Sequence, residues 1–459
     1  MWDATTNVAP STSGNNHPRV VTDREGNPMI LWYHAERAMF SRWNGSAFET
    51  PRILNPLSMT VAGATWMGPD IAVHGDTIYV VFKATPEHED KSWIIHSYDG
   101  GDTFSDPVQI DQSDEYLSRF PTVTTDENGN PIVAFMKFNH SFGEARWSVA
   151  RSFDGGLSFA NDELASGWSS GTSHVCDCCP GSIVNSENTV AMVYRDNNSN
   201  VRDTWAGISY DGGWTFTEGM NLDYNNWMIM QCPASGPDAI ILGDTLYSVF
   251  MNGASGRNMV YFSRASLTTK EAIVNVITGD NPDITVQNFP RIAEYNNAVA
   301  VVYRQVSEGQ TQLAINFTSD ITEGLPEAHD TVDVDNINNA DVAIAKEKIY
   351  VVWEDGNSGT IKFRSGTYTV RTAIGDEINK NIISVYPNPS FGKWTISGLD
   401  MKTESRVQLF NTNGQMLSQQ SHSAGNANLE IENYYLESGM YYLNISNAKE
   451  QRTLKLMKF

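Results

Sequence analysis

The sequence has 459 residues, with 31 Lys and Arg against 54 Asp and Glu, and its formal net charge is −23 at pH 7. A chain this acidic is not expected to bind nucleic acid or an anionic membrane through its whole surface. The length leaves room for a sizeable core and for more than one domain. No run of about 18 apolar residues occurs that would span a membrane.

The N-terminal segment, residues 1–16, is polar and rich in turn residues. Met1–Thr6 lacks the basic and apolar regions of a secretory leader, so either the protein stays in the cytosol or a leader has been removed before Met1. We expect Asp3–Pro10 to supply an outer strand that the last repeat of the following domain lacks. Such a strand would close a ring.

Internal repeats fill roughly residues 17–370. A short opening motif occurs around Pro18, Pro69, Pro121, Pro180, Pro237 and Pro290, and a degenerate copy has Ala340 in place of the proline. Each copy is followed by a β-rich run; the runs are Met29–Tyr33, Thr77–Phe82, Ile132–Phe138, Thr189–Tyr194, Thr245–Phe250, Ala298–Tyr303 and Ile349–Trp353. Seven copies about fifty residues apart predict seven four-stranded blades, the pattern of a β-propeller. Independent sandwich domains would need about 100 residues each and are excluded.

A second motif, Ser-x-Asp-Gly-Gly-x-(Thr/Ser)-Phe, occurs at Ser97–Phe104, Ser152–Phe159 and Ser209–Phe216. Its Asp can accept hydrogen bonds from N–H groups of its own turn, its Gly pair permits positive φ, and its final aromatic can pack between strands. These stretches resemble the Asp boxes of sialidases and other BNR-repeat propellers, and the resemblance covers three blades. It supports the fold more than an activity, because a fold does not determine chemistry.

The Asp-box turns predict which face of the ring carries the site. They lie between the third and fourth strands of a blade, so the start of the first strand and the loop after the second strand lie on the opposite face. That face collects Arg and His side chains in a protein that is otherwise acidic, which would suit an anionic ligand. Alternatively, some of these Arg side chains form ion pairs between blades with Asp70, Asp196, Asp238 and Asp341.

The four cysteines lie in linkers on that same face. The sequence His174-Val-Cys176-Asp-Cys178-Cys179 precedes the fourth repeat, and Cys232 precedes the fifth. One interpretation is a structural Zn²⁺ site formed by His174, two of the clustered cysteines and Cys232. The other is disulfide bonding, as expected for an exported chain. In either case the residues would hold the fourth and fifth blades together.

The composition changes after a polar joint at residues 371–381. Residues 382–459 contain Tyr386-Pro-Asn-Pro-Ser390, the strand-like segment Leu436–Ile445 and a terminal strand Thr453–Phe459, and they predict a small antiparallel sandwich. This segment closely resembles the type A C-terminal sorting domain of the type IX secretion system of Bacteroidetes. The resemblance implies recognition by that secretion machinery, a secreted or cell-surface location and removal of the domain after export.

The resemblance to sialidases does not extend to their active-site motifs. A sialidase would have a Phe/Tyr-Arg-Ile-Pro start, three Arg for the carboxylate, an Asp acid and a Tyr/Glu nucleophile pair. This chain has Asn16-His-Pro-Arg19 and Phe289-Pro-Arg291 instead. Seven repeats, the His/Tyr/Arg-rich face, the export segment and the cysteine cluster are more similar to the ulvan lyases of polysaccharide lyase families twenty-four and twenty-five.

The leading hypothesis is therefore a secreted lyase that cleaves a sulfated, uronic-acid-containing algal polysaccharide of the ulvan type by β-elimination. Such an enzyme neutralises the uronate carboxylate and moves two protons, tasks suited to Arg, His and Tyr. We expect His140, Tyr194 and Arg195 to be catalytic. The residues expected to bind substrate are Arg202, Arg119, His34, His17, Asn139 and Arg291. Alternatives are a sialidase-like exo-glycosidase and a non-catalytic glycan-binding propeller, and we expect a monomer.

Overall fold

The computed structural model describes residues 2–8, 13–113, 115–141, 143–170, 174–369, 384–388, 390–397, 404–423, 428–447 and 451–459. The chain divides into two compact units, Met1–Val370 and Arg371–Phe459. The joint expected at residues 371–381 lies outside the described residues. The predicted all-β class is confirmed, since the only helix among the described residues is the short 3₁₀ helix η1 (Ile321–Glu323).

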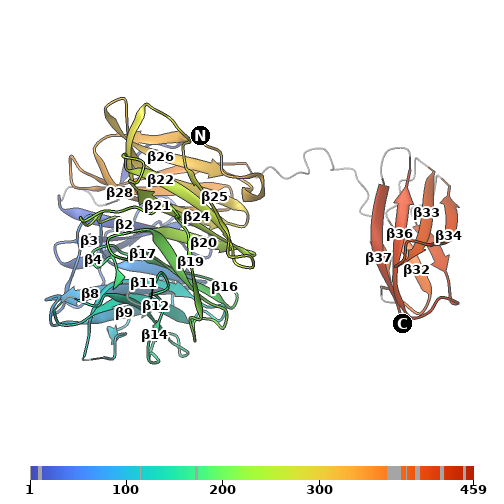
Figure 1. The fold of residues 1–459 in the computed structure, drawn as a ribbon, viewed down its shortest axis with the longest axis horizontal. Coiled ribbons are helices and arrows are strands. Elements are labelled where there is room, and N and C mark those ends of the chain that lie inside the picture. The colour runs from blue at the N-terminus through green and yellow to red at the C-terminus, as the bar shows by residue number, and fades with distance from the viewer. Residues whose placement is uncertain are drawn as a thin grey trace. The chain divides into compact units, whose positions relative to one another are not determined.

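The described strands of the first unit form seven antiparallel sheets, numbered here by chain order (Figure 1). Sheet 1 contains β2 (Asn15–Thr22), β3 (Pro28–His34), β4 (Arg37–Arg42) and β5 (Arg52–Ile53). Sheet 2 contains β7 (Asp70–His74), β8 (Thr77–Thr85), β9 (Ser92–Ser97) and β10 (Val108–Gln109), with β6 (Thr60–Val61) paired to β8. Sheet 3 contains β11 (Leu117–Thr125), β12 (Pro131–Phe138), β13 (Arg146–Arg151) and β14 (Glu163–Leu164).

The remaining sheets repeat this pattern. Sheet 4 contains β16 (Ser182–Ser186), β17 (Thr189–Asn197), β18 (Thr204–Ser209) and β19 (Glu218–Asn221), with β15 (His174–Val175) paired to β17. Sheet 5 contains β20 (Asp238–Leu242), β21 (Thr245–Asn252), β22 (Met259–Ser266) and β23 (Ala272–Val276). Sheet 6 contains β24 (Ile284–Tyr295), β25 (Ala298–Ser307), β26 (Gln310–Thr318) and β27 (Asp330–Val334). Sheet 7 contains β28 (Ile337–Ala345), β29 (Lys348–Asp355), β30 (Ile361–Thr367) and β1 (Thr6–Asn7).

Each predicted β-rich run forms the second strand of one sheet, and these strands are buried on both sides. In β17, Val190, Met192 and Tyr194 pack toward sheet 3, whereas Ala191 and Val193 pack toward sheet 5. Such a strand has no polar face, which explains why these runs are continuously apolar rather than alternating. The core of the unit therefore lies between neighbouring sheets.

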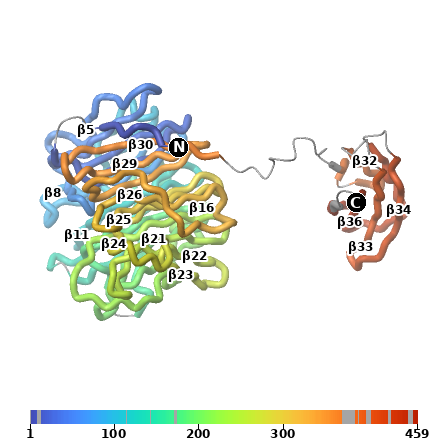
Figure 2. Tube along the Cα trace, turned by 90° about the horizontal axis from the view of Figure 1, so that it is seen from above, coloured from blue at the N-terminus to red at the C-terminus, as the bar shows by residue number. Residues whose placement is uncertain are grey.

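The first strands of the sheets form a closed cycle. β2, β7, β11, β16, β20, β24 and β28 each contact the next, and β28 contacts β2. The N-terminal segment completes the last sheet, because Thr6 pairs with Phe363 and Asn7 with Lys362. Figure 2 shows the N-terminus beside β30, among strands from the end of this unit. The predicted closure is confirmed, and the arrangement is propeller-like.

The three Asp-box turns have the expected internal hydrogen bonds. Asp99 Oδ1 accepts from Ser97 Oγ at 2.7 Å and from Thr103 N at 2.9 Å, and the same bonds recur around Asp154 and Asp211. Gly100 and Gly101 have φ of 69° and 87°, which an L side chain rarely adopts. The turn is therefore held by its own hydrogen bonds, and in sheet 2 Arg42 of sheet 1 adds a bond to Gly100 O at 2.9 Å.

These turns also determine the polarity of the ring. Gly100 N donates to Asp76 O at 2.8 Å, so the turn after the third strand touches the turn after the first strand. The tyrosine inside the box reaches the next sheet, where Tyr98 Oη donates to Gly155 O at 2.8 Å. The start of each first strand therefore lies on the opposite face, as predicted.

A ring of three carboxylates links the sheets around the axis; those of Asp238 and Asp341 are buried and that of Asp70 is partly exposed. Asp341 Oδ2 accepts from Val20 N at 2.9 Å, joining sheet 7 to sheet 1, and Asp238 Oδ2 accepts from Ile292 N at 3.0 Å, joining sheet 5 to sheet 6. Asp70 Oδ2 accepts from Thr122 Oγ1 at 2.7 Å, joining sheet 2 to sheet 3. This set of three carboxylates is the axial carboxylate ring.

Two guanidinium groups lie within the axial carboxylate ring, the buried one of Arg19 and the largely buried one of Arg291. Arg291 Nε is 3.0 Å from Asp341 Oδ1 and 3.3 Å from Asp238 Oδ2, and Arg19 Nε is 3.7 Å from Asp70 Oδ1. Burial alone would lower the pKa of Arg291, but Asp238 and Asp341 raise it above its ordinary value. The alternative interpretation of these two Arg residues as ion-pair partners between sheets is therefore confirmed.

The second unit has two antiparallel sheets. One contains β31 (Ser384–Tyr386), β32 (Lys393–Ser397) and β35 (Asn428–Glu432), and the other contains β34 (Met416–His422), β33 (Ser405–Asn411), β36 (Gly439–Ser446) and β37 (Gln451–Lys458). Their common core includes Trp394 and Ile396 of the first sheet and Leu409 and Leu443 of the second. The two sheets thus bury their apolar faces against each other.

Replacing Arg291 tests the axial carboxylate ring. Arg291→Met leaves the carboxylates of Asp238 and Asp341 buried without their cation, so we expect the free energy of unfolding to fall by about 3–5 kcal/mol. Arg24→Met, which removes an exposed partner of Asp76, should cost less than about 1 kcal/mol. Denaturant titration of both variants measures the difference. A cost for Arg291→Met as small as that for Arg24→Met would contradict this role.

Candidate functional site: the axial pocket

The opening motif of the repeats produces a β-bulge at the axis. The pairing of β2 with β3 shifts between Asn16 and Arg19, and β11 and β24 shift at the equivalent position. The residue before the proline has a positive φ in all three: 53° in His17, 52° in Phe120 and 52° in Phe289. Such backbone conformations cost about 1–3 kcal/mol each for a non-glycine residue and cluster at functional sites.

These bulges line a pocket on the face opposite the Asp-box turns. It has a volume of about 50 Å³, and its lining residues come from the first strand of each sheet or from the segment directly before it. The lining residues are His17, Arg19, Trp66, Met67, Gly68, Asp70, Phe120, Pro121, Thr122, Pro180, Gly181, Gly236, Pro237, Phe289, Pro290, Arg291 and Asn339. We call this the axial pocket. Its walls combine aromatic rings with a few polar groups, as is usual for ligand pockets.

His17 is the imidazole among the lining residues. Arg19 Nη2 donates to its Nε2 at 2.6 Å, and its Nδ1 lies 3.5 Å from Thr65 O. Burial, followed by the charges of Arg19 and Arg291, lowers the pKa of His17 well below 6.5. His17 is therefore neutral at neutral pH, with its basic nitrogen on Nε2.

A buried carboxylate positions the rim beside His17. Glu354 Oε1 accepts from Asn16 Nδ2 at 2.9 Å, Asn338 Nδ2 at 2.8 Å and Thr65 Oγ1 at 3.1 Å. The carbonyl of Thr65 in turn accepts from Asn339 Nδ2 at 2.7 Å. This network joins sheets 1 and 7 to the loop before sheet 2. It holds Thr65 against the pocket.

Arg119 lies at the rim of the pocket and is partly exposed. Its guanidinium carbon lies 4.7 Å from the ring centroid of Phe120 and 5.7 Å from that of Trp66, and its Nε is 3.3 Å from Glu87 Oε1. Stacking on two aromatic rings fixes the plane of the guanidinium. The group can therefore meet an anionic ligand at the mouth of the pocket.

The charge at the axis differs from the sequence-based expectation. The cations of Arg19 and Arg291 lie among three carboxylates, those of Asp70, Asp238 and Asp341. Since His17 is neutral, the cluster has no excess of positive charge. Arg291, expected to bind substrate, instead compensates the axial carboxylate ring. The expected positive funnel is therefore absent from the axis itself.

The structure does not bring the three residues expected to be catalytic into this pocket. Tyr194 is fully buried between sheets 3 and 4, and burial raises its pKa. Arg195 is also buried, and it donates to the carbonyls of Arg202 at 2.8 Å and Met251 at 2.5 Å. His140 is exposed in the loop after β12, on the same face as the pocket but outside its lining.

The other residues expected to bind substrate are also dispersed. Arg202 is buried, and its Nη1 donates to Cys176 Sγ at 3.1 Å. Asn139 Oδ1 accepts from Ser141 N and Gly143 N, so it stabilises its own loop. His34 ends β3, and its Nδ1 is buried without a hydrogen-bond partner. Of the expected set, the structure brings together His17, Arg291 and, at the rim, Arg119.

Several lining residues were not expected at the site from the sequence, among them Trp66, Phe120, Phe289 and Asn339. Three of these four were accessible from the repeats, because the residue before each repeated proline, or before Ala340, is the one that the bulge turns toward the axis. The reasoning emphasised the charged residue after the proline instead. Trp66 lies outside the repeated motif, and no pattern in the sequence identifies it.

The C-terminal unit matches a known family. The model of the secretion system C-terminal sorting domain matches residues 384–458. The chain ends in this sorting domain. The protein is therefore secreted or held at the cell surface. Among the described residues, no helix has the length and apolar character needed to cross a membrane.

The chain resembles solved structures in fold. Two structures of a family 25 polysaccharide lyase, an ulvan lyase, have TM-scores of 0.51 and 0.50 with 11% and 10% identity, and each match covers 79% of this chain and 94% of the other. One of them is bound to -[GlcA(1-4)Rha3S]-. A sialidase of Trypanosoma rangeli has a TM-score of 0.44 at 9% identity, covering 99% of this chain and 89% of its own. No curated protein matches the sequence significantly.

The cysteines of this exported chain lie beside sheets 4 and 5. Cys178 and Cys232 form a disulfide with a Cα–Cα distance of 6.2 Å, which joins the segments that precede β16 and β20. Cys176 and Cys179 are buried thiols whose sulfur atoms are 2.9 Å apart. The expected link between the fourth and fifth sheets is therefore a disulfide in this structure.

The same cysteines are the group that could hold a metal ion. The sulfur atoms of Cys176, Cys178, Cys179 and Cys232 all lie within 4.8 Å of one another. His174 is not part of that group, and its Nδ1 lies 2.6 Å from Arg146 Nη1. With the disulfide formed, two thiols remain, whereas a structural zinc site needs four ligands. The disulfide and a four-cysteine metal site therefore exclude each other.

Removing the disulfide tests its role. The double variant Cys178→Ser/Cys232→Ser loses a cross-link between residues 54 positions apart, so we expect the free energy of unfolding to fall by about 2–4 kcal/mol. Thiol titration of the denatured wild-type protein should give two thiols, those of Cys176 and Cys179. Four thiols together with one bound zinc would instead establish the metal site.

Proposed function

We propose that the protein is a secreted, glycan-active enzyme whose site is the axial pocket. More specifically, we propose a polysaccharide lyase that cleaves a uronic-acid-containing sulfated polysaccharide of the ulvan type. In this proposal, residues 1–370 form a seven-bladed β-propeller that carries the activity. Residues 382–459 form an antiparallel sandwich that carries the export signal.

The observation that carries the proposal is the strained lining of the pocket. His17, Phe120 and Phe289 all adopt φ near +52° in bulges of three different sheets and all line one pocket. Strained backbone conformations that recur around one pocket are expected where a ligand or a reaction requires the side chains to point in a particular direction. The aromatic rings offer faces for sugar C–H groups, and the likeness in fold to an ulvan lyase favours a polyuronate among possible glycans.

The proposed reaction needs three kinds of group. A base removes the proton from C5 of the uronate, the C4–O bond breaks as a C4=C5 double bond forms, and an acid protonates the departing oxygen. A cation or a hydrogen-bond donor must neutralise the carboxylate, because the C5 proton is otherwise too weakly acidic. No pair of catalytic carboxylates is required, unlike in most glycoside hydrolases.

The geometry favours His17 as the base and Arg119 as the carboxylate partner. His17 is neutral, which a base must be, and its Nε2 is held by Arg19 until a substrate carboxylate competes for that guanidinium. Arg119 is presented at the mouth on the rings of Phe120 and Trp66. His17 takes the place of Tyr194 among the catalytic residues because the Tyr194 side chain has no exposed surface. For His140, which is exposed on the same face, we propose the role of the acid.

A non-catalytic glycan-binding protein is the second candidate. The observation that favours it is the hydrogen bond from Arg19 to His17, which occupies the basic nitrogen in the absence of ligand. An exo-glycosidase of the sialidase kind has less support. Its carboxylate candidates, Asp70 and Asp238, are engaged within the axial carboxylate ring, and no tyrosine lines the pocket.

Ulvan distinguishes these functions directly. We expect incubation with the protein to raise the absorbance near 235 nm, because β-elimination leaves a C4=C5 double bond conjugated to the carboxylate. Release of reducing sugar without that absorbance would establish a glycosidase. Binding to ulvan without any cleavage would establish the non-catalytic protein, and both results would overturn the lyase.

Substitutions test the assigned residues. His17→Gln should lower kcat at least about 100-fold, the usual contribution of a general base, and Arg119→Gln should raise KM about tenfold through the lost charge-assisted bond. His74→Gln, on the Asp-box face, is the matched control and should leave both constants unchanged. Thermal unfolding of each variant excludes misfolding. Full activity of a folded His17→Gln protein would remove His17 from the mechanism.

The pH dependence gives a separate test of His17. Because burial and two neighbouring guanidinium groups lower its pKa, His17 loses its proton below pH 6.5 as the pH rises. A base becomes active when it loses its proton, so kcat/KM on ulvan should rise through an acidic limb below pH 6.5 and stay level through neutral pH. A limb centred above pH 6.5 would argue for a different base.

A further inference from the structure

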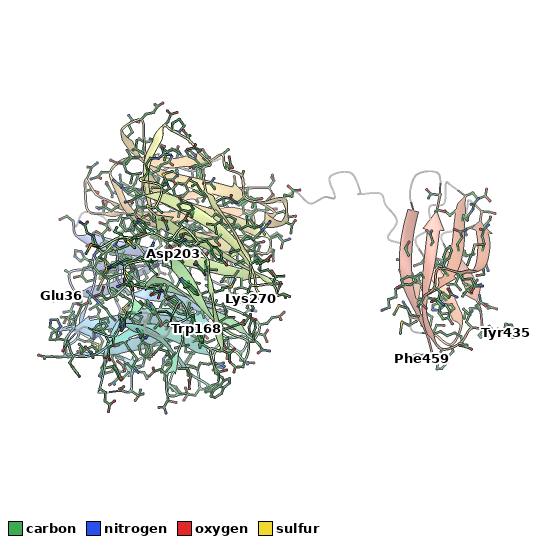
Figure 3. The ribbon with its side chains drawn as sticks, viewed as in Figure 1. Glu36, Trp168, Asp203, Lys270, Tyr435 and Phe459 are labelled. Atoms are coloured by element: carbon green, nitrogen blue, oxygen red, sulfur yellow. A yellow bond between two sulfur atoms is a disulfide. The ribbon has the colours of Figure 1, made fainter. Side chains whose placement is uncertain are left out.

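The sorting domain exposes four large aromatic side chains. The exposed fractions are 77% for Phe391, 56% for Tyr434, 98% for Tyr435 and 60% for Phe459. Tyr435 and Phe459, labelled in Figure 3, both lie toward one end of this unit. We call these four residues the terminal aromatic patch. Exposed rings gathered in this way on a small unit are typical of an interaction surface.

Backbone hydrogen bonds hold the three segments of the patch together. Phe459 N donates to Ser390 O at 2.9 Å, Ser390 N donates to Met457 O at 3.0 Å, and Asn433 N donates to Gly392 O at 2.7 Å. The rings of Phe391 and Phe459 lie 5.3 Å apart between centroids. The patch is therefore built from the loop after β31, the turn after β35 and the C-terminus of the chain.

The patch contributes nothing to the core of the unit. The core is formed by residues such as Trp394, Leu409 and Leu456, and none of the four patch residues belongs to it. Leaving large rings in water has no benefit for stability, whereas covering them with a partner is favourable by about 25 cal/mol per Å² of apolar surface. The exposed rings are therefore available to a partner without any unfolding.

The charge of the sorting domain differs from that of the rest of the chain. Residues 371–459 have nine Lys and Arg against eight Asp and Glu, whereas residues 1–370 have 22 against 46. Two of the basic residues, Lys455 and Lys458, belong to β37, next to Phe459. Glu432 and Glu437 stand at the two ends of the turn that carries Tyr434 and Tyr435, so the cations lie beside the Phe459 side of the patch only.

We propose that the terminal aromatic patch is the surface by which the export machinery recognises this chain. The occupant is a protein component with an apolar groove that would cover the rings, and with carboxylates on the side that faces Lys455 and Lys458. The family match supplies the reason to expect such a partner, because a sorting domain must be bound by a sorting protein. This inference does not depend on the function proposed for the axial pocket.

The test is export of the full chain from a bacterium that has this secretion system. In the variant Phe391→Ser/Tyr435→Ser/Phe459→Ser we expect at least a tenfold loss of protein from the medium and cell surface, with accumulation in the periplasm, measured by immunoblot. The matched control is Met416→Ser/Tyr442→Ser, which removes two exposed apolar side chains outside the patch. It should be exported normally.

A charge variant keeps the test independent of folding. Lys455→Glu/Lys458→Glu leaves the rings in place but opposes an acidic rim, and it should also lower export at least about threefold. Thermal unfolding of the purified full-length variants should match the wild-type protein. Normal export of the triple variant would overturn the proposal. It would also be overturned if the charge variant were exported normally and the triple variant had a lowered unfolding temperature, because the export loss would then follow from misfolding.

The same variants, studied as purified proteins, test two other occupants of the patch. If light scattering shows a wild-type dimer that the triple variant cannot form, the patch binds a second copy of the chain. If only the wild-type protein sediments with phospholipid vesicles, the patch binds a lipid surface. Either result, with export unchanged, would replace the proposed partner.

Discussion

The ring of sheets depends on carboxylates that are bonded across sheet boundaries. No backbone ladder joins one first strand to the next, so the axis requires polar groups that reach sideways. Asp70, Asp238 and Asp341 each accept from the main chain of the following sheet, and Arg291 joins two of them. Burying such charges is tolerable only when each is paired and hydrogen-bonded. Arg291, which pairs with two of these carboxylates, is consequently needed for the fold and is not free for a ligand.

The same strands that close the ring also create the pocket. In β2 the bulge lies around Pro18. The residue after this proline reaches the axial carboxylate ring, and the residue before it points into the pocket. Both residues of β2 line the pocket, but only Arg19, two positions after His17, also faces the carboxylate of Asp70. The positive φ of His17 is maintained because its neighbours on both sides are fixed by strand pairing. Fold and site are thus two consequences of one local geometry.

Sequence repeats were sufficient to predict the sheets, the box turns and the pairing of β1 with β30, because each follows from local chemistry or from spacing. The site was less accessible. Tyr194 and Arg195 lie in a strand that is buried on both sides, so the sequence has no alternation to show where each side chain points. The bulges add a second difficulty, because a shift of one residue moves a side chain to the other face. Cysteine pairing was left open for a similar reason: spacing alone does not determine it.

Electrostatics constrains how the proposed substrate could bind. A polyanion that approaches residues 1–370, with 46 acidic and 22 basic side chains, is repelled over the surface as a whole. At physiological ionic strength this repulsion extends only about 8 Å, so attraction must come from direct contacts within the pocket. Arg119 is suited to that task because its guanidinium is held at the rim by Phe120 and Trp66, outside the axial carboxylate ring. For a polyuronate, recognition would therefore depend on stacking and on a few short polar contacts rather than on long-range steering.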